Sequence, residues 1–144
     1  MEKKKLTYIE YINKQKVIEF TRICKVSEIP DYFLIEYLVE KKDKIQLCVY
    51  KNNDIITIIR NGLITYTVKH QNELSMELEI KIKNELINEI FKQKIKTNKV
   101  SIIQENNNFQ IEIEFKKDEE IIKSIYQIKG ANNGWCYKRI SKRN

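Results

Sequence analysis

The pair Asn61-Gly62 constrains the fold of this chain more than any other short segment. It lies between two runs rich in β-branched residues, 55–59 and 63–68. Asn and Gly both tolerate the positive φ of a type I′ turn, and such a pair between β-type runs is the strongest short-range hairpin signal. Gly62 is also the only glycine before position 130. The segment therefore predicts a two-residue turn and an antiparallel fold.

Alternation of apolar and polar residues predicts further strands along the chain. Residues 75–83 place apolar side chains at every second position and mostly charged ones between them, which is typical of a half-buried antiparallel strand. Nine or ten such segments are separated by polar turns, and the single proline, Pro30, marks one break. This spacing predicts an all-β antiparallel sandwich or barrel.

Residues 84–95 fit two interpretations. The apolar side chains at 86, 87, 90 and 91 match one face of a helix as well as a strand, and Asn84 is a favourable N-cap residue. The sequence therefore leaves a short helix near 84–95 and an irregular strand as alternatives.

Length and charge predict one domain and a tail. The 144 residues are 42% apolar and 33% charged, which fits one globular domain, placed at 1–128. The formal net charge is +7, and residues 130–144 contribute four bases and no acid. The expected organisation is a nearly balanced body followed by a basic tail at 129–144.

The N-terminus and the cysteines predict a cytoplasmic protein without a metal. No apolar run reaches signal-peptide or membrane-spanning length. Cys24, Cys48 and Cys136 are far apart, and His70 is the only histidine. This pattern favours reduced thiols and offers no metal or cofactor motif.

Five segments follow one another like the strand motifs of a known family: residues 17–20, 32–37, 58–62, 109–115 and 124–128. Over about residues 6–128 the chain resembles an uncharacterised bacterial family of calycin-like, lipocalin-like β-barrels, a domain of unknown function. Two departures stand out: Ile23-Cys24 replaces an early glycine of the second strand, and no glycine turn is present near Asn84. The second departure weakens the strand interpretation of residues 84–97.

The resemblance implies a closed antiparallel barrel of about eight strands, or eight to ten by the strand count above. Barrels of this wider group bind small apolar molecules inside, although fold analogy alone is a weak argument for function. The expected function is a small-molecule or partner-binding module without catalysis. The expected interior rows are Ile18/Phe20, Phe33/Ile35, Ile45/Leu47/Val49 and Ile111/Ile113.

Arg22 and Glu36 are the first candidate ligand contacts. Arg22 shares the strand face of Phe20 and Cys24, so it is expected to point inward, where a guanidinium needs a partner. Glu36 is the proposed partner. The alternatives are an anchor for a carboxylate-bearing ligand, a structural ion pair, and an outward Arg22 beyond a bulge.

Arg60 and Tyr37 complete the candidate ligand contacts. Arg60 follows Ile56 and Ile58 on one strand face and stands at a hairpin end. It is expected to seal the barrel end by bonding backbone carbonyls, with ligand contact as the alternative. Tyr37 belongs to the motif of the third strand.

Catalytic residues are not predicted. His70 is expected at the solvent end of its strand, and no spacing supplies a nucleophile or third group beside it. An enzyme is disfavoured on these grounds.

The basic tail suggests an alternative function. It interleaves aromatic and cationic residues, a composition that stacks on bases and neutralises phosphates. The candidate nucleic-acid contacts are Trp135, Tyr137, Lys138 and Arg139.

Overall fold

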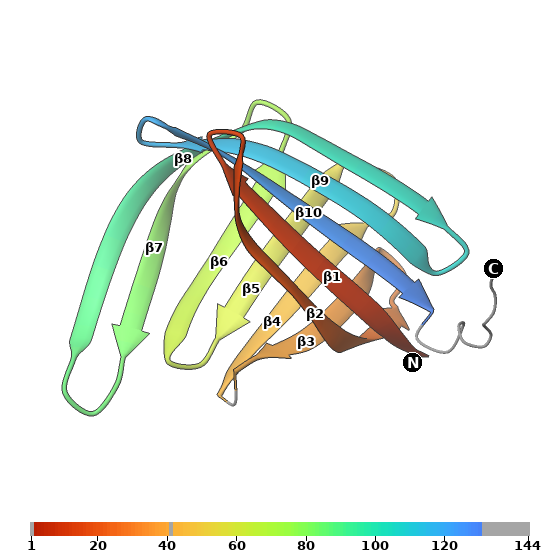
Figure 1. Ribbon diagram of the computed structural model, residues 1–144, viewed down its shortest axis with the longest axis horizontal. Helices are drawn as coiled ribbons and strands as arrows, with labels where there is room; N and C mark the ends of the chain where they lie inside the picture. The colour runs from red at the N-terminus through yellow and green to blue at the C-terminus, as the bar shows by residue number, and fades with distance from the viewer. Residues whose placement is uncertain (1, 41, 131–144) are drawn as a thin grey trace.

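The computed structural model describes residues 2–40 and 42–130, which form ten antiparallel strands (Figure 1). Each strand pairs with its sequence neighbours, and β1 also pairs with β10, so the sheet closes into a barrel. The strands are β1 (Glu2–Ile12), β2 (Gln15–Glu28), β3 (Tyr32–Val39), β4 (Asp43–Tyr50), β5 (Ile55–Asn61), β6 (Ile64–Gln71), β7 (Ser75–Lys83), β8 (Asn88–Glu105), β9 (Asn108–Lys117) and β10 (Glu120–Gly130). The predicted all-β antiparallel barrel is confirmed.

The simple up-and-down order gives the barrel two distinct ends. The turns after β1, β3, β5, β7 and β9 lie at one end, here called the hairpin end. The N-terminus, the end of β10 and the remaining turns lie at the other, here called the terminal end (Figure 1). Side chains near the C-terminal ends of odd-numbered strands therefore meet those at the starts of even-numbered strands.

The predicted alternative of a helix near 84–95 is wrong, because these residues form a strand hairpin. Asn84 accepts hydrogen bonds from the amides of Leu86 (2.8 Å) and Ile87 (2.7 Å), which holds a tight turn instead of capping a helix. β8 then runs for 18 residues beside β7 and β9. Leu86 is 94% exposed, so the apolar stripe that suggested a helix has no surface on which a helix would pack.

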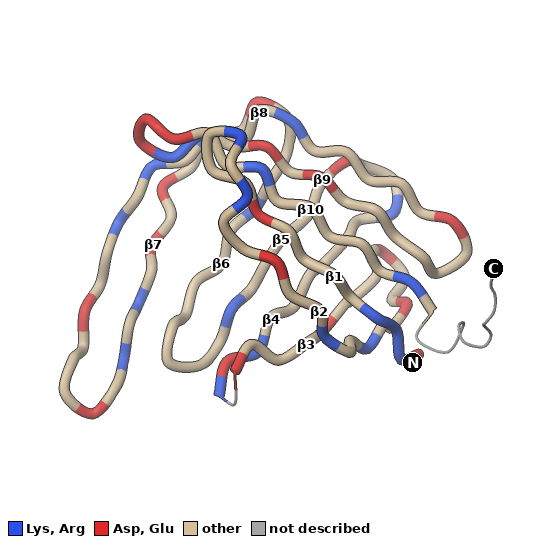
Figure 2. Tube along the Cα trace, in the orientation of Figure 1, with Lys and Arg blue, Asp and Glu red and all other residues tan. Residues whose placement is uncertain are grey.

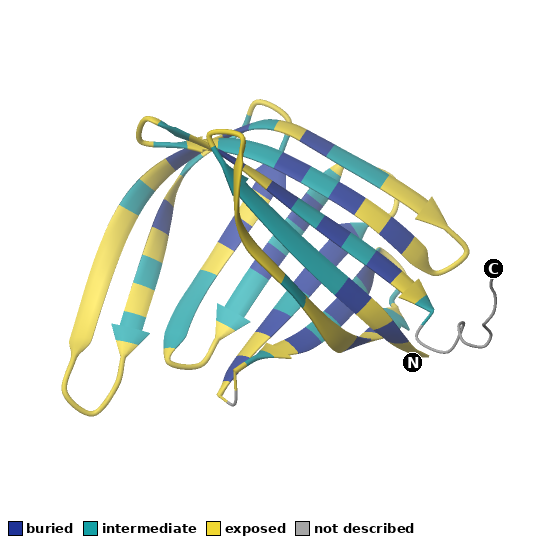
Figure 3. Cartoon of the chain, viewed as in Figure 1, coloured by how far each residue is buried: buried dark blue, intermediate teal, exposed yellow. Residues whose placement is uncertain are grey.

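The first half of β8 and the neighbouring β7 form an arm that projects from the barrel, at the left of Figure 3. Its outer residues are largely exposed, whereas the barrel body alternates buried and exposed positions (Figure 3). The arm joins β6 through only two ladder pairs, Ile64↔Ile82 and Thr65↔Lys81.

The two-residue turn predicted at Asn61-Gly62 is wrong, and a turn of that length lies instead at Asn13-Lys14. Arg60 pairs with Tyr66, so the β5–β6 connection is wider than two residues, and Asn61 does not have a positive φ. Asn13 and Lys14 instead have φ values of 49° and 71° between the paired residues Ile12 and Gln15. Asn13 is held there by bonds to the backbone of Ile121, at 2.8 and 2.9 Å. The two-residue turn at Asn13-Lys14 is therefore held by a contact with β10, a strand far away in the sequence.

A separation between β2 and β3 interrupts the barrel wall at the hairpin end. Their ladder covers only Lys25–Glu28 of β2 and Phe33–Glu36 of β3, among the residues that the structure describes. Residues 15–24 of β2 continue beside β1 alone, and the two strands diverge from β3 in Figure 1. Ile18, expected in the interior, is therefore 41% exposed, although it lies on the inward row.

The core fills the barrel interior where the wall is continuous. The other predicted interior rows are confirmed: Phe33, Ile35, Ile45, Leu47, Val49, Ile111 and Ile113 are all buried. Six of these residues are at most 4% exposed, so the packed part of the core excludes water.

Asp43 joins two turns of the hairpin end. Its carboxylate, 3% exposed, accepts bonds from Arg60 Nε (2.8 Å) and from the amides of Leu63 (2.8 Å) and Ile64 (3.3 Å). Burial disfavours the charge, but the amide of Leu63, the Arg60 guanidinium and the amide of Ile64 together lower the pKa of Asp43. Arg60 thus fixes this end through a carboxylate, and the predicted bonds to backbone carbonyls are wrong.

Charges of both signs are interspersed along the strands of the body (Figure 2). Across residues 2–40 and 42–130, no helix is long and apolar enough to cross a membrane.

We expect Gly62→Ala to destabilise the fold by about 1–3 kcal/mol, because the added Cβ would overlap the Asp43 carboxylate. A Cβ at this position would lie 2.7 Å from Asp43 Cγ and 2.5 Å from the carbonyl oxygen of Lys42. Urea denaturation followed by circular dichroism measures the free energy of unfolding. The control Asn61→Ala changes an exposed residue in the same turn and is expected to stay within about 0.5 kcal/mol of wild type. Equal stability of the two variants would contradict the role assigned to Gly62.

Candidate functional site

A group of polar and aromatic side chains points into the barrel near the hairpin end. Five strands contribute to it, each from a position on its inward row. We call it the tyrosine cluster: Tyr8, Glu10, Phe20, Tyr37, Tyr66, Ser124 and Tyr126. Glu10 shares this row because its ladder partner is Ser124, which is 5% exposed.

The aromatic rings of the cluster contact one another across the interior. Tyr8 lies 4.8 Å from Tyr126 and 5.3 Å from Phe20, measured between ring centroids. Phe20 lies 6.3 Å from Tyr37. These spacings are within the range of favourable aromatic pairs, so four strands present one continuous aromatic surface.

The hydroxyl of Tyr8 connects two polar members of the cluster. It donates a short hydrogen bond to the Glu10 carboxylate and lies 3.1 Å from Ser124 Oγ. Burial raises the pKa of Tyr8, and the neighbouring Glu10 charge raises it further. The phenol is therefore protonated at neutral pH and is a hydrogen-bond donor.

The other tyrosines are also kept neutral. Burial raises the pKa values of Tyr37 and Tyr126, and neighbouring tyrosines raise both of them further. Burial likewise raises the pKa of Tyr66, partly offset by the nearby Arg60. At neutral pH the cluster offers protonated tyrosine hydroxyls, and Glu10 is the acidic residue among its members.

Of the four predicted ligand contacts, Arg22 lies at the edge of this cluster and Glu36 lies away from it. Arg22 is on the inward row, opposite Leu6, but it is exposed because β3 has diverged from β2. Its guanidinium bonds the carbonyl of Thr21 (3.0 Å) and rests 4.7 Å from the Phe20 ring centroid.

Glu36 points to the outer surface of β3 and does not pair with Arg22. The buried residues Ile35 and Tyr37 on either side of it take the inward positions. Its carboxylate instead binds Lys44 Nζ (2.7 Å) and Gln46 Nε2 (3.0 Å), which lower its pKa. Glu36 stands between the apolar residues Ile35 and Tyr37, so the period of two along this strand already indicated in the sequence that Glu36 points outward.

The other two predicted contacts, Tyr37 and Arg60, do lie at the cluster. Tyr37 is buried within it, and Arg60 is inward and adjacent to Tyr66. Sequence reasoning did not identify Tyr8, Glu10, Tyr66 or Tyr126 as candidates. The alternation of β1, β6 and β10 places them on inward rows, but only the closed barrel, in which β1 pairs with β10, brings them together.

His70 is buried, so its predicted position at the solvent end of the strand is wrong. It is 3% exposed, its Nδ1 lies 2.9 Å from Thr97 Oγ1, and its ring packs 4.9 Å from that of Phe115. Burial lowers the pKa of His70 to about 4. Its contacts with a buried threonine hydroxyl and a phenylalanine ring are those of a core residue.

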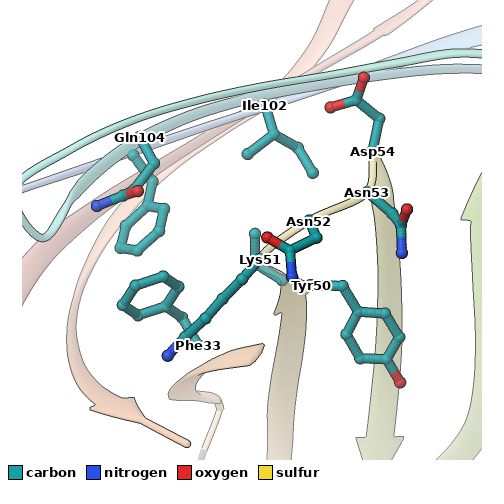
Figure 4. A pocket seen from close by; sticks show the side chains of 10 residues that line it. Phe33, Tyr50, Lys51, Asn52, Asn53, Asp54, Ile102 and Gln104 are labelled. Atoms are coloured by element: carbon teal, nitrogen blue, oxygen red, sulfur yellow. The ribbon is translucent and has the colours of Figure 1, made fainter. Parts of the chain in front are cut away.

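A second site of interest is a surface pocket at the terminal end (Figure 4). It has a volume of about 380 Å³ and lies between the β4–β5 turn and residues of β3, β8 and β9. Lys51, its cation, is engaged by Glu28 at 2.6 Å and lies 5.1 Å from the Phe33 ring centroid. Because its cation is already paired with Glu28, we treat this pocket as the weaker candidate.

The remaining predictions concern metals and nucleic acids. No group of three or more His, Cys, Asp or Glu gathers within the described ranges in a way that would hold a metal ion. Trp135, Tyr137, Lys138 and Arg139 lie outside the described residues, so nucleic-acid binding by the tail stays a prediction.

Comparison with known proteins supports the fold but supplies no activity. No protein family and no curated protein matches the chain. A solved structure of the ywiB protein from Bacillus subtilis is similar, with a TM-score of 0.74, 12% identity, and coverage of 90% of this chain and 91% of that one. The isotype 1 transferrin binding protein B of Neisseria meningitidis aligns at 11% identity over 89% of this chain and 25% of that one. Its TM-score of 0.31 is too low to indicate a shared fold.

The likeness to ywiB therefore shows the barrel fold alone. These comparisons do not establish membership of the calycin-like family.

We expect the buried His70 to make stability depend on pH between about 6.5 and 4. Its pKa is about 4 in the folded chain and about 6.5 when unfolded. Below pH 6.5 the unfolded chain therefore binds the proton more readily. The free energy of unfolding falls as pH drops through this range, by up to roughly 3 kcal/mol.

Urea denaturation from pH 7.5 to 4 in wild type and His70→Asn measures this effect. Asn keeps a polar group near the Thr97 hydroxyl but does not titrate, so its stability is expected to fall less steeply. Carboxylates titrate in both proteins, and their contribution cancels in the difference. Parallel pH profiles of the two proteins would contradict the assignment.

Proposed function

We propose that this protein is a noncatalytic barrel that binds a small molecule at the tyrosine cluster. One observation carries the proposal: the barrel wall separates between β2 and β3 beside the place where the interior is polar and aromatic. Tyr8, Phe20 and Tyr66 are only partly buried there. Binding sites of this type combine an apolar lining with a few convergent polar groups.

The cluster carries the features of a binding site better than those of an active site. Tyr8, Glu10 and Ser124 are connected by hydrogen bonds, but no histidine, cysteine or amine adjoins the Ser124 hydroxyl to activate it among the described residues. Protonated phenols are suited to orienting a polar ligand, and the rings are suited to covering its apolar surface. An apolar molecule and one bearing a carboxylate are the two ligand classes that the sequence suggested.

The test is native mass spectrometry of the full chain purified from cells. We expect a copurifying small molecule at one per chain. Replacing two hydroxyls in Tyr8→Phe/Tyr126→Phe is expected to lower its occupancy by about tenfold, since each lost hydrogen bond contributes about 1 kcal/mol. The rings stay in place, so the change reports on the hydroxyls.

The matched control is Tyr32→Phe/Tyr50→Phe, a tyrosine pair 5.5 Å apart outside the cluster. Because Tyr50 lines the pocket at the terminal end, this control also tests that alternative site. Loss of the copurified molecule in the control alone would move the site to that pocket. Absence of any adduct, together with no binding of the neutral probe N-phenyl-1-naphthylamine, would overturn the proposed function.

A further inference from the structure

Resting on the proposed function, we propose that the ligand of the tyrosine cluster is an organic cation, an amine or quaternary ammonium group held by Glu10 and the surrounding rings. This assigns a ligand class opposite in charge to the carboxylate suggested by Arg22 and Arg60. The argument depends on which interior charges are already neutralised.

Arg60 is not free to bind an anionic ligand. Its guanidinium contacts the Asp43 carboxylate through two nitrogens, at 2.7 and 2.8 Å. Asp43 is 2% exposed, so the pair is a shielded structural unit that also holds the amides of Leu63 and Ile64. A ligand carboxylate would have to compete with Asp43 at a guanidinium whose charge is already neutralised.

Glu10 is the interior charge without a cationic partner in the described ranges. Its carboxylate accepts a hydrogen bond from the neutral hydroxyl of Tyr8, and no Lys or Arg nitrogen of residues 2–40 and 42–130 lies within 4 Å of it. Lys4, on the same row of β1, is six residues away, or roughly 20 Å along a strand. Lys4 is engaged instead by Asn108 and Glu2.

Among Glu10, Asp43 and Arg60 the formal charges sum to minus one, and the further cation at the edge of the cluster, Arg22, is exposed and lies over the Phe20 ring. A half-buried carboxylate is stabilised by an opposite charge, and a bound cation would supply it. The overall charge of +7 does not oppose this, because the local groups decide the field at short range.

The rings around Glu10 have the composition that favours a cation. Tyr8, Phe20, Tyr37 and Tyr126 form a connected surface with neighbouring centroids 4.8–6.3 Å apart for the three measured contacts. The faces of aromatic rings attract cations, and groups of rings recognise ammonium ligands. One ring already carries a cation of the protein itself, since the Arg22 guanidinium rests 4.7 Å from the Phe20 centroid.

The test uses three probes of similar shape and different charge on the full chain. They are benzyltrimethylammonium, its neutral isostere neopentylbenzene, and anionic 3-phenylpropionate. Affinities are measured by ligand-observed NMR titration. We expect the cation to bind about tenfold or more tighter than the neutral probe, because only it gains the ring and carboxylate interactions. The anion is expected to bind most weakly.

Two variants on neighbouring strands separate charge from shape. Glu10→Gln keeps an acceptor for Tyr8, and it is expected to abolish the preference for the cation while leaving the affinity of the neutral probe unchanged. Glu19→Gln is the matched control, because Glu19 pairs with Lys16 on the exposed face of β2. It is expected to behave as wild type. Melting temperatures confirm that both variants fold.

Arg22→Gln tests whether Arg22 competes with a cationic ligand for the Phe20 ring or anchors a carboxylate-bearing ligand. Removing the competing guanidinium from Phe20 is expected to raise the affinity of the cation severalfold. If Arg22 instead anchors a carboxylate, this variant would weaken binding of 3-phenylpropionate.

Failure of this inference is distinguishable from failure of the proposed function. Equal or tighter binding of the neutral or anionic probe, or no binding of the cation, overturns the cationic ligand class. The proposed function is overturned only if no small molecule copurifies with the chain and N-phenyl-1-naphthylamine does not bind. A Glu10→Gln variant that keeps the full preference for the cation also overturns the inference.

Discussion

The buried contact between Asp43 and Arg60 organises the hairpin end of this barrel. It joins the start of β4 to the end of β5, and the same carboxylate holds the first amides after Gly62. Breaking a buried ion pair by removing one partner typically costs about 3–5 kcal/mol, since the other charge stays behind. The β5–β6 connection follows this carboxylate and not the turn preference of Asn61-Gly62, and Gly62 leaves the space that the carboxylate occupies.

The same contact affects the chemistry of the interior. Asp43 neutralises the charge of Arg60, so Glu10 is the charged member of the tyrosine cluster. The phenol of Tyr66 lies beside the Arg60 guanidinium, which already has Asp43 as its partner. The divergence of β2 from β3 then keeps Phe20 and Tyr8 partly exposed beside a packed core. A polar group inside a fully closed barrel would need every hydrogen bond satisfied internally, whereas one beside a separation in the wall is open to water or a ligand.

Local patterns predicted the strands well where one face is buried and the other solvated. Residues 75–83 were predicted with the bounds that β7 has, and the interior rows of β3, β4 and β9 are buried as expected. The predictions failed where a partner distant in sequence decides the outcome. Ile18 follows the inward alternation, but the missing contact with β3 exposes it, and His70 is covered by Thr97 and Phe115 from other strands. No period along one strand contains this information.

The sequence by itself determined that this chain forms antiparallel strands, which side chains share a face, and that Gly62 occupies a special position. It determined these because alternation and turn preferences act over a few residues. Only the tertiary structure decided that β1 closes on β10, that Asp43 neutralises Arg60, and that β2 diverges from β3 beside Arg22. Ring closure fixes the register between strands far apart in the chain, and that register assembles the tyrosine cluster, in which Tyr8 donates a hydrogen bond to Glu10.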